Sequence, residues 1–414
     1  MLPPRPRKVI LLGSGRTYRL AAFTEAAERL GIGVVTGDDV PLPMMSHAAA
    51  LDLPLDYRDL VRSTEAVVAF ARRVPVAAIV GVDDSGTLLA ARASQSLGLP
   101  HNAPEAALAA RDKHLMRCHF AAAGVPSPAF QRWKVTDDPA RVAAATRFPC
   151  VVKPTTLSGS RGVMRADDPL QLAERFARLS TILAHERCAD VLVEDYIPGV
   201  EVALEGLLDD GVLRILALFD KPDPLEGPYF EETLYVTPSR LPASAQSALR
   251  RAAAAAAASL GLRQGPIHAE LRWNERGAFL IEVAARSIGG LCSKTLRFGT
   301  DMSLEELILR QALGLSVDAA RSGRAGGVMM IPIPAAGHLR RVTGVDAATA
   351  VPGIEAVEIT ARMNHPLVPL PEGDSYLGFI FARGDSPDEV ERALRAAHGC
   401  LRFEIVPEMR MAPA

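Results

Sequence analysis

Residues 267–290, IHAELRWNERGAFLIEVAARSIGG, carry the strongest structural signal in this chain. Within them, the segments IHAELRW and AFLIEVA alternate polar and apolar residues with a period of two, which is typical of half-buried β-strands. The intervening NERG is short enough for a hairpin, and a three-residue loop at 275–277 with Gly277 in the left-handed conformation would close it. The stretch therefore predicts two antiparallel strands joined by a tight turn.

This loop determines which residues of the two strands lie opposite each other. With Asn274 facing Ala278, counting outward places Glu270 opposite Glu282. One face is then apolar and is predicted to be the core side: Ile267, Ala269, Leu271, Trp273, Phe279, Ile281 and Val283. The other face carries most of the polar side chains: His268, Glu270, Arg272, Leu280, Glu282 and Ala284.

Two facing carboxylates need a compensating charge. Opposed side chains of an antiparallel pair lie about 4.5–5.5 Å apart, and like charges repel at that distance. Either Arg272 and Arg286 neutralise the two acids, or a divalent cation binds between them. Arg286 and a turn at 287–290 follow the second acid, and an anion would meet both a guanidinium and free N–H groups there. We favour the cation, because acids for Mg²⁺ beside an arginine and such a turn are suited to phosphate chemistry.

Composition narrows the classes of protein to which the chain can belong. Its 414 residues are enough for roughly two to four compact units. With a net charge of −2 and no run of basic residues, the sequence suggests neither a nucleic-acid partner nor an anionic membrane. Five scattered cysteines without CxxC or CxxH spacing favour reduced thiols. No apolar run approaches the ~20 residues of a membrane span, so a cytoplasmic location is expected.

The N-terminal part alternates strands with helices, which predicts a parallel sheet with helices on its faces. Strands are expected at 8–13, 33–39 and 76–84. The turn GSGRTY at 13–18 matches only the first two glycines of a dinucleotide-binding fingerprint, because Tyr18 stands where the third belongs. A dehydrogenase would rest on this turn alone, and a simple strand-to-helix turn explains it better.

The rest of the chain mixes strands and helices less regularly. Helices are expected at 106–123, 170–185, 243–260, 303–313 and 386–398. Strands are expected near 130–134, 148–154, 191–197, 201–220 and, after a composition break at 323–327, in several short segments. A Pro-rich excursion at 221–242 has no assigned strand or helix.

Lys153 stands at the end of an apolar strand, just before Pro154 and a loop at 155–162 that is rich in glycine and hydroxyl groups. Backbone amides of such a loop can close around phosphate oxygens, and Arg161 adds positive charge. A lysine at a strand end is also common without any such role. The chain has no GxxxxGK[ST] sequence, since Ser293-Lys294-Thr295 lacks the glycine, and a P-loop nucleotide site is therefore excluded.

Five motifs occur in a characteristic order: RDK (111–113), VVKP with its glycine loop (151–162), VEDYIPGVE (193–201), HAEL (268–271) and IEVAARSIGG (281–290). This set resembles the carboxylate–amine ligases of the ATP-grasp superfamily, with an added C-terminal domain as in the L-amino-acid ligases. The resemblance implies an α/β and α+β multidomain fold: a Rossmann-like pre-ATP-grasp domain at 1–105, a two-part ATP-grasp at 106–322 with its lid near 126–195, and a small α+β domain at 323–414.

The resemblance also implies a nucleotide site. Lys113 and Lys153 resemble two lysines that contact ATP phosphates. The mobile loop over the triphosphate is matched by Ser158, Gly159, Ser160, Arg161 and Gly162. The positions that meet adenine and ribose are matched by Glu194, Asp195, Tyr196, Ile197 and Glu201, where either the carboxylate of Glu194 or the neighbouring backbone would meet the adenine amino group.

Metal and substrate positions follow from the same resemblance. Glu270 and Glu282 correspond to the magnesium ligands, and Arg286 to the arginine that steadies the transferred phosphate; with Lys153 and Arg161 it is expected to be catalytic. The substrate carboxylate would meet the turn of Ser287, Gly289 and Gly290. Many relatives have Asn as a further metal ligand where this chain has Ala284, so either water or His268 would complete that shell; His268 opposite Ala284 suits a packed supporting residue better. In the excursion, Glu231 or Glu232 could receive a substrate ammonium, although a solvated loop explains them equally well.

The implied activity is ligation of a small-molecule carboxylate to an amine, using ATP and Mg²⁺, through an acyl-phosphate. Two magnesium ions are expected, with Mn²⁺ as an alternative, and a homodimer is considered. Two other readings remain open. The chain could be another ATP-grasp ligase or carboxylase, of the purine-pathway or biotin-carboxylase kind, or an ATP-binding regulatory protein without catalysis. The paired acids Glu270 and Glu282 argue against the regulatory protein, because a pure binder has little use for them.

Overall fold

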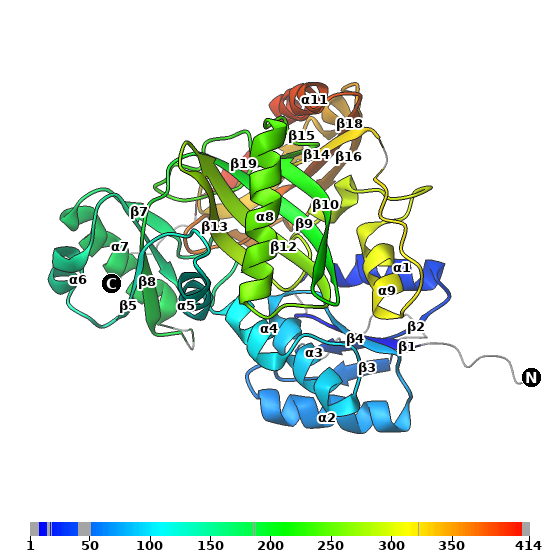
Figure 1. Cartoon of the computed structure of the whole chain (residues 1–414). Coiled ribbons are helices and arrows are strands. Elements are labelled where there is room, and N and C mark those ends of the chain that lie inside the picture. The colour runs from blue at the N-terminus through cyan, green and yellow to red at the C-terminus, as the bar shows by residue number, and fades with distance from the viewer. Residues whose placement is uncertain are drawn as a thin grey trace, which may run out of the picture.

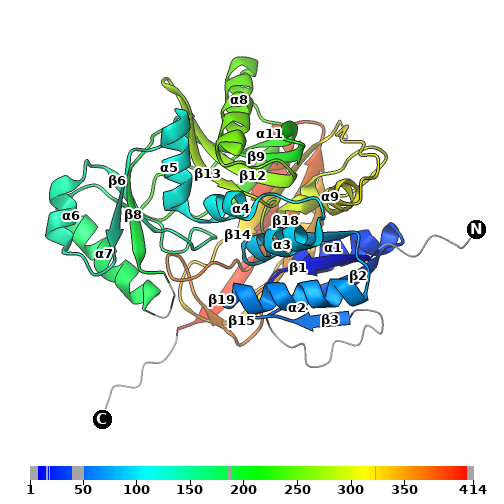
Figure 2. The same cartoon turned by 60° about the horizontal axis from the view of Figure 1, so that its bottom comes forward.

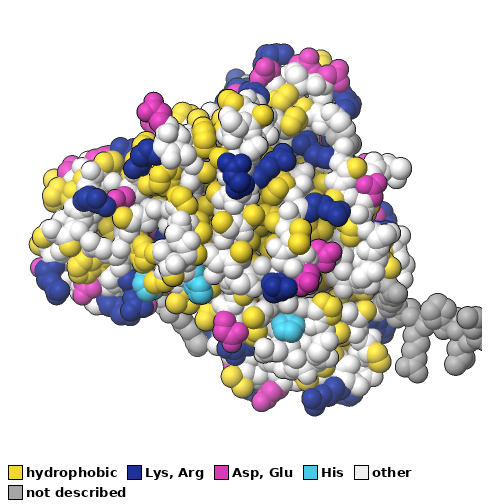
Figure 3. Space-filling model, in the orientation of Figure 1, with side chains coloured by type: hydrophobic (Ala, Val, Ile, Leu, Met, Phe, Trp, Pro, Cys, Tyr) yellow, Lys and Arg dark blue, Asp and Glu magenta, His cyan; other side chains and the backbone are white. Residues whose placement is uncertain are grey.

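The structure is a computed structural model, and it describes residues 8–14, 17, 19–39, 51–184, 186, 188–321 and 323–407. Figure 1 shows an N-terminal domain below a central sheet, a small lid at its left, and the C-terminal strands and helix above. None of the described helices has the length and apolar character needed to cross a bilayer. On the face drawn in Figure 3, acidic and basic side chains are interspersed, in keeping with the small net charge.

The N-terminal domain is a parallel sheet of four strands in the order β3-β2-β1-β4. Its elements are β1 (Lys8–Leu12), α1 (Arg19–Arg29), β2 (Gly33–Asp38), β3 (Leu51–Pro54), α2 (Leu60–Arg73), β4 (Ala78–Gly81), α3 (Asp84–Leu97) and α4 (Pro104–Arg111). The strands are apolar on both faces because helices cover both: Val9 and Leu11 pack toward α1, whereas Ile10 and Leu12 pack toward α2 and α3. The predicted fold class is confirmed. The turn at 13–18 lies partly outside the described residues.

The helix predicted at 106–123 is in fact two helices, α4 and α5 (Lys113–Ala123). Asp112 between them is extended, with φ −94° and ψ 112°, and its carboxylate accepts hydrogen bonds from the backbone N–H groups of His114 and Leu115. Aspartate is a strong N-cap, so the helix restarts at this residue instead of running through it. The break places Lys113 in the first turn of α5, where its N–H donates to the Thr155 carbonyl at 2.8 Å.

The lid is an antiparallel sheet of four strands in the order β5-β8-β6-β7, covered by α6 and α7. Its elements are β5 (Phe130–Lys134), α6 (Pro139–Ala145), β6 (Cys150–Pro154), β7 (Met164–Ala166), α7 (Pro169–Leu183) and β8 (Asp190–Asp195). Its hydrophobic core is built from its own residues, and among the described residues only Tyr229 joins it from elsewhere. The lid is therefore a packing unit distinct from the central sheet.

The central sheet has eight strands in the order β13-β12-β9-β10-β11-β14-β18-β16, and all neighbours are antiparallel. Its middle part comprises β9 (Val200–Asp209), β10 (Val212–Asp220), β11 (Leu234–Thr237), α8 (Ala243–Ser259), β12 (Gly265–Asn274), β13 (Gly277–Ala284), the 3₁₀ turn η1 (Cys292–Thr295) and α9 (Leu304–Ala312). The Ala-rich helix α8 lies across one face of the sheet, where small side chains allow close packing (Figure 1).

Three strands from beyond residue 322, β14, β18 and β16, extend this same sheet, so the central sheet continues across the predicted domain boundary. The strands β17, β15 and β19 form a separate antiparallel sheet. The elements are β14 (Ala325–Ile331), β15 (Gly337–Thr343), α10 (Val345–Thr349), β16 (Ile354–Ile359), β17 (Pro366–Leu367), β18 (Gly378–Gly384), α11 (Pro387–Cys400) and β19 (Arg402–Val406). The glycines at 326–327 lie inside β14, where a Cβ on Gly327 would come within 2.9 Å of the Tyr235 carbonyl oxygen. Gly327 thus allows close packing against β11, which the sequence analysis had left unassigned, whereas Gly326 allows close approach to the Thr295 carbonyl oxygen.

The β12–β13 hairpin keeps the predicted pairing of Glu270 with Glu282 but reaches it differently. Asn274 pairs with Gly277, so the predicted three-residue loop is wrong and the turn has two residues. A bulge at Ile281 adds one residue to β13 and restores the register at the two acids. Between the turn and the bulge, the side chains of β13 lie on the opposite faces of the hairpin from those predicted.

The reversal moves three side chains of β13. Leu280 is fully buried in the core beneath α8, whereas Phe279 and Ile281 are only half-buried, contrary to prediction. The backbone carbonyl of Ile281 accepts a 2.6 Å hydrogen bond from Arg117 of α5, which supports the bulge from outside the hairpin.

Candidate active site

A cavity of about 600 Å³ lies where the N-terminal domain, the lid, the central sheet and the C-terminal strands meet. Each region supplies part of its wall, represented by Asp84, Lys153, Glu270 and Tyr376 respectively. Figure 2 shows the lid strands to the left of α4 and α3 of the N-terminal domain. Most of the residues that the sequence analysis singled out face this cavity.

Glu270 and Glu282 both line the cavity, and each has a lysine beside it. Glu282 Oε2 lies 3.3 Å from Lys113 Nζ, and Glu270 Oε1 lies 3.4 Å from Lys221 Nζ. The two acid side chains are 27% and 23% exposed, so both carboxylates remain open to the cavity. The two arginines considered as partners bind elsewhere, Arg272 to Glu201 and Arg286 to Asp84, each at 2.8 Å.

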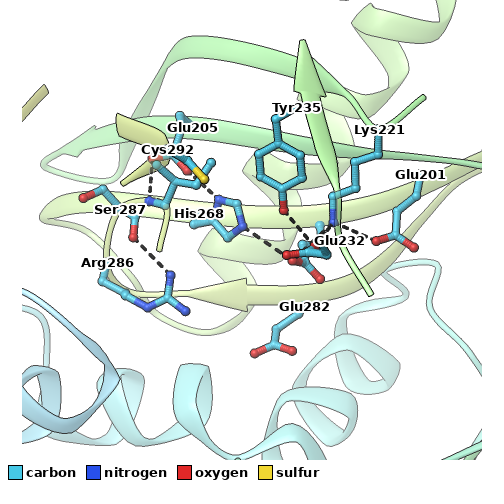
Figure 4. A network of polar contacts seen from close by, with 12 residues as sticks. Glu201, Glu205, Lys221, Glu232, Tyr235, His268, Glu282, Arg286, Ser287 and Cys292 are labelled. Carbon is cyan, nitrogen blue, oxygen red and sulfur yellow. Dashed lines mark hydrogen bonds and ion pairs between the residues drawn. The ribbon is translucent and has the colours of Figure 1, made fainter. Parts of the chain in front are cut away.

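Lys221 lies at the centre of a cluster of three acids, Glu201, Glu232 and Glu270. Figure 4 shows its ammonium between Glu201 and Glu232. Its ammonium contacts Glu201 Oε1 at 2.8 Å and also binds Glu232, whose carboxylate accepts a 2.7 Å hydrogen bond from the Tyr235 hydroxyl. One oxygen of each acid lies within 4.8 Å of the others, which is suitable spacing for a metal ion. Burial opposes the charge of Lys221, but the three carboxylates raise its pKa well above the usual value.

Lys221 was not identified from the sequence because it lies in the Pro-rich excursion, immediately after β10. Its backbone N–H donates to the Glu201 carbonyl, so the residue still follows the register of β9 and β10. A lysine at the end of a buried strand, as in ALFDK, was the available signal. The same signal had been used for Lys153, where a glycine loop followed.

Lys153 and Glu194 form a second charged cluster together with Arg117 of α5. Lys153 Nζ lies 2.6 Å and Arg117 Nε 2.7 Å from the Glu194 carboxylate, and all three side chains are at most 5% exposed. Burial lowers the pKa of Lys153 despite the attraction of Glu194. Burial alone would raise the pKa of Glu194, but Arg117 and Lys153 hold it below its usual value. The carboxylate of Glu194 is thus occupied by two cations, and Asp195, Tyr196 and Ile197 line the cavity beside it.

Arg286 lies against the N-terminal domain. Its guanidinium bonds Asp84 at 2.8 Å, and burial, which disfavours the charge, is outweighed by Asp84, so that the pKa of Arg286 is raised. Ser287 is fully buried, and its carbonyl accepts hydrogen bonds from Arg286 at 3.0 Å and from Arg19 at 2.7 Å. Arg19, at the start of α1, also lines the cavity and was missed, because nothing in its local sequence distinguishes it from a surface residue of a helix.

The loop at 158–162 enters the cavity with three of its residues, Ser158, Gly159 and Ser160. Gly159 and Ser160 have positive φ angles of 64° and 56°, which is typical of backbone that turns successive N–H groups toward one side. Lys113 Nζ donates to the Leu157 carbonyl at 2.7 Å and so ties the start of this loop to α5.

Sixteen of the predicted site residues line the cavity: Lys113, Lys153, Ser158, Gly159, Ser160, Glu194, Asp195, Tyr196, Ile197, Glu201, Glu232, Glu270, Glu282, Arg286, Gly289 and Gly290. Four do not: Arg161, Gly162, Ser287 and Glu231. The predicted catalytic Arg161 instead pairs with Glu186 at 2.7 Å, and it is displaced from the cavity because the loop turns outward after Ser160.

His268 lies opposite Ala284 as predicted and is held by acids on both sides. Its Nδ1 lies 2.5 Å from Glu205 Oε1 and its Nε2 lies 3.6 Å from Glu270 Oε1. Burial lowers its pKa, but Glu205 outweighs burial and raises it to about 9. At neutral pH both ring nitrogens therefore carry protons, which suits a supporting hydrogen-bond donor and not a metal ligand.

The cavity and the grasp-like arrangement of lid and sheet define an ATP-grasp protein. Family models match the chain in the expected order: the ATP-grasp N-terminal domain at residues 24–101, the ATP-grasp domain at 146–295, and the L-amino acid ligase C-terminal domain 2 at 329–406. The chain therefore contains an ATP-grasp domain, preceded by the N-terminal domain of that kind and followed by a C-terminal domain of the L-amino acid ligase type.

Individual relatives agree with this placement. An L-amino acid ligase from Bacillus licheniformis has the same fold, with a TM-score of 0.80 and 24% identity over 98% of this chain and 100% of that one. Alanine–anticapsin ligase of Bacillus subtilis is 30% identical over 51% of this chain and 49% of its own length. Carnosine synthase 1 of Gallus gallus is 28% identical over 78% of this chain. The matches to these two ligases span about half of their length or less, 49% and 39%.

Proposed function

We propose that this ATP-grasp protein is an ATP- and Mg²⁺-dependent ligase that joins a small carboxylate to an amine through an acyl-phosphate, releasing ADP and phosphate. The observation that carries the proposal is the convergence of Lys113, Lys153, Glu270, Glu282 and Arg286 in one cavity. Cations for phosphate, acids for metal and an arginine for the reacting group are the parts that such a transfer needs. Because a relative is named alanine–anticapsin ligase, we infer that one substrate is an amino acid.

For the nucleotide, we assign the phosphates to Lys113, Lys153 and the loop residues 158–160. Both lysines are 4% exposed and are paired with acids on the cavity wall, so an arriving phosphate can replace a carboxylate as the partner of each ammonium. The positive φ angles of Gly159 and Ser160 support binding of phosphate oxygens by backbone N–H groups. We assign adenine to the backbone of 194–197 and ribose to Glu201.

The donor set fits magnesium. Glu270 and Glu282 offer carboxylate oxygens from adjacent strands, and Glu201 and Glu232 bring further oxygens close to Glu270. Oxygen-only donors suit Mg²⁺ or Mn²⁺, and two groups of acids are consistent with two ions. Ala284 supplies no donor, so water would complete that shell. When bound, Mg²⁺ neutralises phosphate charge and favours transfer.

The protein's own groups then have distinct tasks. Arg286, fixed by Asp84, offers its guanidinium to the negative charge that develops on the transferred group. Gly289 and Gly290 border the cavity, and we assign their N–H groups to the substrate carboxylate. Lys153 aligns the phosphates, and the lid keeps water away from the acyl-phosphate, which would otherwise hydrolyse.

Nucleotide product analysis with Mg-ATP and pooled amino acids and small amines tests the proposal. ADP and phosphate that appear only with a carboxylate, together with a condensed mass, are expected. AMP and pyrophosphate would contradict the acyl-phosphate route. ADP formation that requires bicarbonate would favour a carboxylase, and tight ATP binding without turnover would favour a regulatory protein.

A homodimer and a cytoplasmic location remain predictions. Sedimentation velocity of the purified chain, with and without Mg-ATP, would establish the oligomeric state. Fractionation of cells that express the natural chain would establish where it resides.

A further inference from the structure

The segment 369–376, PLPEGDSY, joins β17 to β18 and touches both the lid and the cavity. Two of its carbonyls accept hydrogen bonds from the end of the lid loop. Pro371 O accepts from Gly162 N at 2.8 Å, and Glu372 O accepts from Arg161 Nε at 2.9 Å. The outward turn that removes Arg161 from the cavity thus brings it to the C-terminal region.

The side chain of Glu372 adds a second attachment, to α7 of the lid. Its two carboxylate oxygens accept hydrogen bonds from Nε and Nη2 of Arg178, at 2.6 Å and 2.8 Å respectively. This is the bidentate geometry in which an arginine–carboxylate pair is strongest. Arg178 also donates to the Tyr229 hydroxyl, and its hydrogen bonds to the Glu372 carboxylate raise the pKa of Arg178.

The far end of the same segment forms part of the cavity wall through Asp374, Ser375 and Tyr376. A Cβ on Gly159 would lie 3.2 Å from Asp374 Cβ, so the segment packs directly on the loop that we assign to phosphate. Tyr376 packs edge-to-face on Phe379 of β18, with ring centroids 5.9 Å apart. A ligand in the cavity therefore has access to the same short segment that contacts the lid.

The two regions joined by this segment differ in how they are held. The lid has its own sheet and its own core. The segment is instead continuous with β18, which is paired on both sides within the central sheet, by β14 and β16. It is therefore a fixed support on which a separately packed lid rests.

We propose that segment 369–376 is a latch for the lid, and that Glu372 is the positioning residue that holds the loop 158–162 over the cavity. Because Asp374, Ser375 and Tyr376 face the cavity, occupancy of that wall stabilises the latched state. The catalytic consequence rests on the proposed nucleotide role of the loop, whereas the mechanical contact does not.

Hydrogen–deuterium exchange of the full chain tests the contact without substrates. In Glu372→Gln, exchange in peptides that cover 157–163 should rise about two- to fivefold, since one half-exposed ion pair restrains the loop. The matched control is Glu404→Gln, which removes an exposed C-terminal ion pair with Arg341 at 3.1 Å and should leave this exchange unchanged. The exchanged pair Arg178→Glu with Glu372→Arg should restore protection. Equal exchange in Glu372→Gln and in the control would overturn the latch.

Mg-ATP turnover provides the second readout. The ATP concentration for half-maximal rate should rise in Glu372→Gln by about two- to fivefold, with little change in kcat, and more phosphate should be released per amide formed. If the wild-type chain forms no amide, the proposed function fails while the exchange result still decides the latch. An increased exchange with unchanged nucleotide dependence and coupling would overturn the assigned role of Glu372 in holding the loop over nucleotide.

Discussion

The two charged clusters of the cavity are each built around a buried lysine, but they have opposite charge. Lys153 shares one acid, Glu194, with Arg117, so cations are in excess. Lys221 is surrounded by three acids, so anions are in excess. The pKa shifts follow this difference: burial lowers the pKa of Lys153, whereas the surrounding carboxylates overcome burial and raise that of Lys221.

This difference in charge indicates which kind of ligand each cluster would bind. An excess of buried cations attracts phosphate, and an excess of acids attracts a metal ion, because unpaired charge in a partly desolvated site is costly. In both clusters, the ion pairs between the lysine and its acids hold the charged side chains in place until a ligand binds. We expect the largest effect from removing Glu282, the acid that pairs with Glu270 across the hairpin, and smaller effects from removing single members of the two clusters.

Glu282→Gln should lower Mg-dependent ADP formation by at least about 10³-fold, because it removes a proposed metal ligand and leaves the fold intact. Glu275→Gln at the exposed hairpin tip is the matched control. Steady-state ADP release would be measured for both variants. Activity of Glu282→Gln within a few-fold of the wild type would refute the metal assignment.

Arg117→Met should reduce the free energy of unfolding by about 3 kcal/mol, because Glu194 would remain buried with one cation instead of two and the Ile281 carbonyl would lose its donor. Denaturant unfolding measures this loss. The double variant Arg117→Met, Glu194→Gln should lose more, since the Lys153 ammonium would then be buried without an acid. A double variant as stable as Arg117→Met would mean that Lys153 does not depend on the charge of Glu194.

That bulge marks the limit of what the sequence could predict. Strand alternation and turn chemistry were enough to place Glu270 opposite Glu282, because the acids lie on a face that must avoid the core. The pattern could not reveal the two-residue turn with its compensating bulge. The carbonyl at the bulge bonds Arg117, which is far away along the chain, and no local pattern indicates that contact.

Motif order similarly predicted the cavity residues that lie on strands and tight turns. Motif order failed for residues whose side-chain position is set by tertiary contacts. Arg161 had the expected charge but is drawn outward by Glu186 and the carbonyl of Glu372. Arg19 lines the cavity only through the packing of the N-terminal domain, for which the local sequence has no signal. Lys221 reaches the acids of the cavity wall through the sheet, and its place at the end of β10 was the one signal available.

Lys153→Ala should weaken ATP binding by about 10- to 100-fold, because a buried charge-assisted contact to phosphate is lost. Lys134→Ala, which removes an exposed lid lysine paired with Asp190, is the matched control. Calorimetric titration with Mg-ATP would provide both affinities. An unchanged affinity in Lys153→Ala would count against the cationic cluster as the phosphate site.

Glu232→Gln tests whether this acid of the Lys221 cluster contributes to magnesium binding, and it has the smallest expected effect. Burial and the neighbouring Glu270 raise the pKa of Glu232, while Lys221 opposes them. If Glu232 is ionised and helps to attract metal, its replacement should raise the Mg²⁺ concentration for half-maximal ADP formation by about three- to fivefold, as expected for a charge a few ångströms away. Glu226→Gln, on the exposed part of the same excursion, should not change this concentration.

An unchanged magnesium dependence in Glu232→Gln would mean that Lys221 and the Tyr235 hydroxyl already occupy this carboxylate. The acidic cluster would then act on metal through Glu270 and Glu201 alone, and the excess of anions around Lys221 would be smaller than the contacts indicate.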